Sequence, residues 1–223
     1  MKLEIKNKYL IFPVNTLSTK KVLTFKINDE TVYELNIKLD NGNPNFYAYI
    51  DVSRFIGQTM DIFVAPEMKL EFREADEMNI DNLYCEPMRP QVQYKKKNGW
   101  INDPNGLVYF NGYYHIFYQH APNFEKPWKE NMHWGHARTK DFLTYEELPV
   151  ALYPDKPYDK DGCWSGTAIV KDGRLYLFYA SIHDGVQSVS VAYSDDGINF
   201  EKYEHNPVIA SFPSDGCPDF RDP

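Results

Sequence analysis

The sequence predicts an all-β protein, and three features of its pattern predict it. Short segments in which every second residue is apolar recur along the chain, as in strands buried on one face. Tight-turn sequences rich in Asn, Asp and Gly separate these segments. Aromatic residues make up 16% of the 223 residues, and aromatic side chains favour strands. No segment shows the periodicity of an amphipathic helix.

The first part of the chain predicts a small β-sandwich, which we assign to residues 1–85. Short alternating strands joined by frequent turns are typical of that architecture. The alternating segments are residues 23–27, 32–39, 46–52 and 60–64. Residues 76–90 contain Pro87 and Pro90 and are interpreted as a linker.

Residues 86–223 predict a second domain made of repeated hairpins. Residues 107–110 and 113–118 flank Asn111-Gly112, the strongest short signal for a hairpin. Residues 168–179 repeat the arrangement around a second turn, and a further strand follows. Hairpin units recurring every ~40–60 residues favour the blades of a β-propeller.

Composition and charge restrict the classes of function. A net charge of −8 argues against nucleic acid as a partner, because phosphate binding requires clustered Lys and Arg. Three cysteines are too few and too scattered for a disulfide framework or a zinc site. No apolar stretch approaches the ~20 residues of a membrane-spanning helix, and the charged start does not resemble a signal peptide.

Asp103 is the first candidate for a catalytic residue. Pro104 biases the preceding Asp103 towards an extended backbone, which fixes the direction of its carboxylate. The plainer interpretation is a turn, since residues 103–106 read Asp-Pro-Asn-Gly. The local residues alone leave both interpretations open.

The surrounding motifs resemble glycoside hydrolase family 32, the invertases, levanases, inulinases and related fructan hydrolases. The family signature is a Trp-(Met/Ile)-Asn-Asp-Pro-Asn-Gly run, which residues 100–106 match throughout. Four further motifs follow in the family's usual order, at residues 117–120, 132–136, 164–166 and 220–223. The leader up to residue 85 resembles the extra β-sandwich of some bacterial levanase-like members.

The resemblance implies a five-bladed catalytic propeller and a retaining mechanism, which requires two carboxyl groups. It implies that Asp103 is the nucleophile and that Asp222 stabilises the transition state beside Arg221. The resemblance also implies contacts with a fructose-containing oligo- or polysaccharide. The candidate substrate-binding residues are Trp100, Asn102, Gln119, Trp128, Trp164, Ser165 and Arg221.

No metal or cofactor is expected. His133 and His136 are three residues apart, a spacing that puts them on opposite faces of a strand. The family requires no metal, so we interpret the histidines as structural.

The resemblance also implies an acid/base Glu in a Glu-Cys motif downstream of residues 221–223. Neither Glu201 nor Glu204 is followed by Cys, so we expect the chain to be an N-terminal piece that lacks this residue and a closed propeller. Two alternatives remain open: a related five-bladed arabinan or xylan glycosidase, and a non-catalytic carbohydrate-binding fragment. The sequence does not distinguish sucrose, levan, inulin or a phosphorylated sugar as substrate.

Overall fold

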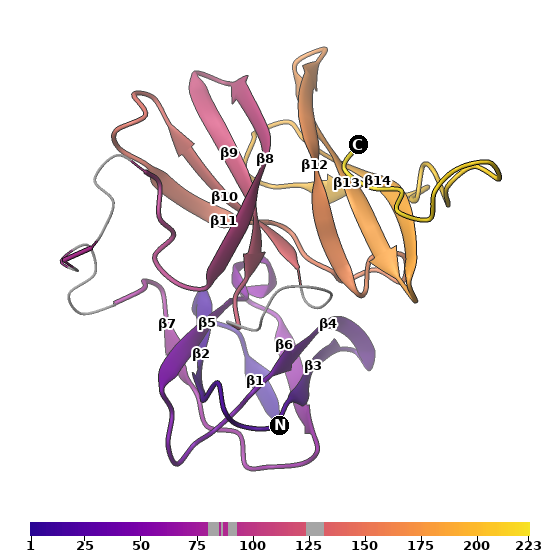
Figure 1. Cartoon of the computed structure of the whole chain (residues 1–223). Coiled ribbons are helices and arrows are strands. Elements are labelled where there is room, and N and C mark those ends of the chain that lie inside the picture. The colour runs from indigo at the N-terminus through magenta and orange to yellow at the C-terminus, as the bar shows by residue number, and fades with distance from the viewer. Residues whose placement is uncertain (80–84, 86, 89–92, 124–131) are drawn as a thin grey trace. The chain divides into compact units, whose positions relative to one another are not determined.

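The computed structural model confirms the all-β prediction (Figure 1). It describes residues 1–79, 85, 87, 88, 93–123 and 132–223, and these contain fifteen strands and one 3-10 helix, η1 (Ser53–Phe55). Within this described part, no helix has the length and apolar character needed to cross a membrane. The chain divides into two compact units, Met1–Trp100 with Ala121–Pro127, and Ile101–His120 with Trp128–Pro223.

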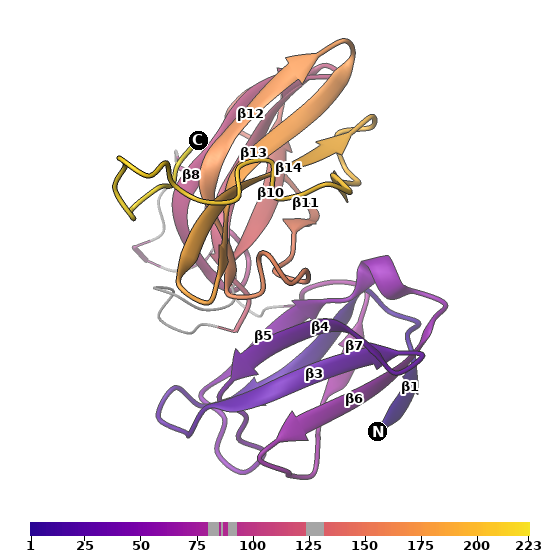
Figure 2. The same cartoon turned by 90° about the vertical axis from the view of Figure 1, so that its right-hand side faces the viewer.

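The first unit contains two antiparallel sheets, visible in indigo to purple in Figure 2. In spatial order, the first sheet consists of β1 (Lys2–Glu4), β6 (Thr59–Ala65), β3 (Lys21–Ile27) and β4 (Glu30–Ile37). The second sheet consists of β5 (Phe46–Asp51), β2 (Tyr9–Val14) and β7 (Arg73–Ala75).

The alternating pattern explains these strands. On β4, Tyr33, Leu35 and Ile37 are buried, whereas Glu34 between them is exposed and accepts a hydrogen bond from Thr24 on β3. The period of two therefore gives the sheet one apolar and one polar face. The β-sandwich assignment and the boundary at residue 85 stay predictions.

The second unit contains two four-stranded antiparallel sheets in which each strand pairs with the next along the chain, as in propeller blades. The first blade is β8 (Trp100–Phe110), β9 (Tyr113–Ala121), β10 (His133–Thr139) and β11 (Glu146–Leu152). The second is β12 (Gly162–Lys171), β13 (Arg174–His183), β14 (Val186–Ser194) and β15 (Glu201–Lys202).

Both predicted hairpins of the second unit are confirmed. Asn111 and Gly112, between β8 and β9, have φ of 49° and 83°, as a two-residue turn with positive φ at both positions requires. Asp172 and Gly173, between β12 and β13, repeat the geometry with φ of 52° and 77°.

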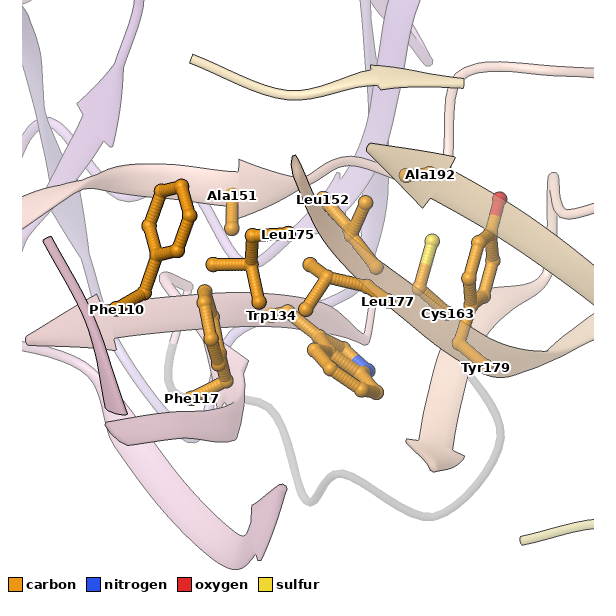
Figure 3. Close-up of a cluster of buried hydrophobic side chains, with 10 residues drawn as sticks. All are labelled: Phe110, Phe117, Trp134, Ala151, Leu152, Cys163, Leu175, Leu177, Tyr179 and Ala192. Atoms are coloured by element: carbon orange, nitrogen blue, oxygen red, sulfur yellow. The ribbon is translucent and has the colours of Figure 1, made fainter. Parts of the chain in front are cut away.

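A shared apolar cluster joins the two blades (Figure 3). The first blade contributes one residue or more from each strand, including Phe117 and Trp134. The second contributes Leu175, Leu177 and Tyr179, which alternate along β13 and so point to the same face. Burial of this cluster fixes the two blades against each other.

A buried histidine pair lies within the first blade. Nδ1 of His115 and Nε2 of His136 are 2.9 Å apart, and Nε2 of His115 is 3.3 Å from the carbonyl oxygen of Phe110. Because Nε2 of His115 donates to that carbonyl, its Nδ1 accepts from Nε2–H of His136. Nδ1 of His136 is then a buried acceptor with no partner among the described groups. This geometry requires a neutral His115, and burial without a described partner for Nδ1 disfavours the charged form of His136.

The pair predicts that acid destabilises the second unit. Burial lowers the pKa of His115, with Arg138 adding to the effect, and burial together with His115 lowers the pKa of His136 well below its ordinary value. Stability is therefore complete above the unfolded-state pKa of about 6.5. As the pH falls below that value the unfolded chain binds protons that the folded chain does not, so the free energy of unfolding decreases.

Urea unfolding between about pH 5 and pH 8 measures this slope. We expect a shallower slope for His136→Phe, and an unchanged slope for the control His205→Asn, since the side chain of His205 is 72% exposed. Identical slopes for wild type and His136→Phe would contradict the interpretation.

Candidate active site

Asp103 lies on β8, the edge strand of the first blade, and its side chain is exposed. The plainer interpretation of residues 103–106 as a turn is wrong, because β8 runs through them to Phe110. Pro104 is tolerated there since an edge strand leaves one side of its backbone unpaired. A Cβ on Gly106, whose φ is 49°, would lie 2.9 Å from Cβ of Ala168 on β12. The glycine therefore permits the edge strands of the two blades to approach closely.

Ser165 lies at an irregular point of β12. The pairing of β12 with β13 is regular from Gly166 to Lys171 but shifts register between Cys163 and Gly166. A bulge of this kind changes the direction in which a side chain points. Oγ of Ser165 lies 2.8 Å from Oδ2 of Asp103 and donates to it.

A chain of hydrogen bonds links Ser165 to two amide side chains. Nε2 of Gln119 donates to Oγ of Ser165 at 2.7 Å, and Nδ2 of Asn102 donates to Oε1 of Gln119 at 3.0 Å. The structure thus brings together four of the residues singled out in the sequence, from β8, β9 and β12. Only Oδ2 of Asp103 has a partner among the described residues, so Oδ1 is available to a ligand.

This arrangement suits a nucleophilic carboxylate beside a sugar. A hydrogen bond from a hydroxyl to a carboxylate is charge-assisted and fixes the orientation of the acceptor. The two amides retain unused donors and acceptors, the pairing that sugar hydroxyls require.

The tryptophan candidates are placed less completely. Trp164 is half-buried next to Ser165, and its carbonyl oxygen accepts a 2.9 Å hydrogen bond from Nε1 of Trp134. Trp100 is the first residue of β8, is half-buried and falls in the first unit. Trp128 lies outside the described residues.

Asp222 and Arg221 are not joined to this network among the described contacts. Nη1 of Arg221 lies 2.8 Å from Asp219, and its Nε lies 3.7 Å from Oδ2 of Asp222. Both side chains are exposed, so their predicted roles stay predictions.

Sequence reasoning did not single out two buried polar residues of the second unit. Asn105 is 2% exposed, and its Nδ2 has no partner among the described groups; its position on β8, two residues after Asp103, was the available signal. Lys202 is a buried lysine on β15, and no sequence pattern marks it. Across the described ranges, no cluster of three or more His, Cys, Asp or Glu is arranged to hold a metal ion.

Residues 94–223 match the glycosyl hydrolases family 32 N-terminal domain. The chain belongs to this family. The match includes every residue of the Asp103 network, so the candidate site lies within the part of the chain that matches the family.

Curated family 32 relatives share much of this region. A levanase of Bacillus subtilis (strain 168) is 45% identical over 154 residues, covering 64% of this chain and 22% of the relative. A sucrose-6-phosphate hydrolase of Escherichia coli is 46% identical over 143 residues, covering 60% of this chain and 29% of the relative. The chain thus spans about a quarter of the length of these relatives.

Solved family 32 structures have a similar fold. A beta-fructofuranosidase of Bombyx mori has a TM-score of 0.53 at 40% identity, covering 60% of this chain and 29% of that one. Fructan 1-exohydrolase IIa of Cichorium intybus has a TM-score of 0.56 at 30% identity, covering 61% and 27%. These matches support the assignment of the second unit as propeller blades.

Proposed function

We propose that the protein carrying this chain is a retaining β-fructofuranosidase that cleaves fructose-containing glycosides, with Asp103 as its nucleophile. The observation that carries the proposal is the hydrogen bond from Ser165 to Oδ2 of Asp103. This bond fixes the orientation of the carboxylate and leaves its other oxygen, Oδ1, open to substrate. Gln119 and Asn102 extend this contact into a polar surface suited to a fructose unit.

The chemistry follows from the two oxygens of Asp103. Oδ1 attacks the anomeric carbon of fructose while the bond from that carbon to the leaving oxygen breaks, which gives a covalent fructosyl-enzyme. A second carboxyl group protonates the leaving oxygen and then takes a proton from the water that releases fructose. The family resemblance assigns that group to a Glu downstream of residues 221–223, and Asp222 to the stabilisation of charge on the sugar.

Family membership favours a fructoside as substrate over arabinose or xylose chains. The relatives are named levanase, sucrose-6-phosphate hydrolase and beta-fructofuranosidase, so sucrose, its 6-phosphate and levan are the substrates to compare. Fructose release from each, and from inulin, by the full-length gene product tests the proposal. Absence of release from all four would overturn it.

Ser165→Ala is expected to lower kcat for fructose release about 10- to 100-fold. The substitution removes one hydrogen bond to a charged group, worth roughly 1.5–3 kcal/mol. Steady-state kinetics on sucrose measures the effect, and Ser214→Ala, an exposed serine, is the matched control. A kcat equal to that of the control would mean that Ser165 does not orient the nucleophile.

A further inference from the structure

A buried lysine ties the two blades together at the segment that connects them. This segment, residues 153–161, runs from the end of β11 to the start of β12 and is named here the interblade connection. Nζ of Lys202, on β15 of the second blade, donates to the carbonyl oxygen of Tyr153 at 2.5 Å, to Asp155 at 2.7 Å and to Asp159 at 2.5 Å. All three protons of the ammonium are therefore used within one segment.

The cluster around Lys202 is well shielded from water. The side chain of Lys202 is 10% exposed and that of Asp159 is fully buried. Burial works against the charged lysine, but Asp159 and Asp155 raise the pKa of Lys202 above its ordinary value, so it stays protonated. The hydroxyl of Tyr179 donates to Oδ2 of Asp159 at 2.8 Å and satisfies this carboxylate further.

Asp159 connects this cluster to the start of β12. Its Oδ1 accepts a hydrogen bond from the backbone N–H of Lys156 at 2.9 Å, and its carbonyl oxygen accepts one from the N–H of Gly162 at 2.9 Å. Gly162 is the first residue of β12 and stands three positions before Ser165. Asp159 therefore links Lys202, through its carboxylate, to the first residue of β12, through its carbonyl oxygen.

The position of Ser165 depends on that starting point. The register shift interrupts the pairing with β13 at Trp164 and Ser165, whereas Gly162, Cys163 and Gly166 on either side pair with β13. Further contacts come from the side of the first blade, through the N–H of Cys163 to the carbonyl oxygen of Met132 at 2.8 Å and through Nε1 of Trp134 to the carbonyl oxygen of Trp164 at 2.9 Å. Because the ladder is disrupted at residues 164 and 165, their positions depend on the residues on either side of them.

We propose that Lys202 is a positioning residue for the nucleophile: by joining Tyr153, Asp155 and Asp159 it holds the bulge that places Ser165 against Asp103. The inference rests on the proposed fructosidase function, and it adds a residue from the outer strand of the neighbouring blade to the support of the site.

Lys202→Met in the full-length gene product is expected to lower kcat on sucrose about tenfold, with KM within about threefold, because misplaced catalytic groups cost rate rather than binding. Lys171→Met, an exposed lysine on β12, is the matched control. Because Lys202→Met removes the cation beside the buried carboxylate of Asp159, Lys202→Met/Asp159→Asn is made in parallel to retain a folded protein. A folded variant of either kind with wild-type kcat overturns the proposal.

A double-mutant cycle with Ser165→Ala separates positioning from general stability. If Lys202 acts through Ser165, adding Lys202→Met to Ser165→Ala lowers kcat no further, whereas independent structural losses multiply. Backbone hydrogen exchange of the full-length gene product gives a readout that needs no activity. We expect faster exchange at residues 162–166 in Lys202→Met and no change at β10. Unchanged exchange at 162–166 overturns the positioning role, whereas absent fructose release by the unmutated protein counts against the proposed function alone.

Discussion

Asp103→Asn in the full-length gene product is expected to lower kcat/KM for fructose release by about 10⁴-fold or more, the order of loss seen when a covalent nucleophile or its partner is removed. The amide is nearly the same size as the carboxylate, and Ser165 still donates to its oxygen. The substitution therefore removes the negative charge and makes the oxygen a poor nucleophile while leaving the hydrogen-bonded geometry in place.

Steady-state kinetics together with thermal unfolding separates chemistry from folding in this variant. Asp103 is exposed, so Asp103→Asn is expected to leave the unfolding temperature unchanged. Asp172→Asn, at the exposed turn between β12 and β13, is the matched control and is expected to retain full activity. Activity of Asp103→Asn within about tenfold of this control would exclude a covalent role for Asp103.

The strand pattern could be predicted from sequence because it depends on local physics. Alternating burial on β4 and the Asn111-Gly112 hairpin follow from period-two patterning and from residues that tolerate positive φ. The order of the motifs identified Asn102, Asp103, Gln119 and Ser165 as candidates, and the structure joins these four by hydrogen bonds.

The direction of those bonds could not be predicted from sequence. That Ser165 is the link between Gln119 and Asp103 follows from a bulge in β12, and a bulge depends on how β12 meets β13 rather than on the residue types alone. Lys202 was missed for a related reason. A lysine is normally exposed, and its burial here follows from three acceptors that lie together on the interblade connection.

Gly166→Ala is expected to destabilise the second unit by about 3 kcal/mol or more, because overpacking against backbone has no flexible side chain to absorb it. A Cβ at residue 166 would lie 2.0 Å from the carbonyl oxygen of Phe178 and 2.8 Å from Cα of Tyr179, both on β13. Strands β12 and β13 must separate to admit the methyl group, and Ser165 would move with β12. We therefore expect loss of fructose release in the full-length gene product as well.

Gly173→Ala is the matched control for the glycine substitution. Gly173 lies in the turn between the same two strands, and a Cβ there meets nothing within 4 Å, although its φ is 77°. The alanine at residue 173 thus carries only the left-handed backbone strain of about 1 kcal/mol. Urea unfolding of both variants isolates the steric effect, because the chemical change is identical. An equal decrease in the free energy of unfolding for both variants would mean that β12 and β13 are already apart at residue 166. The bulge, rather than close backbone contact, would then determine the position of Ser165 beside Asp103.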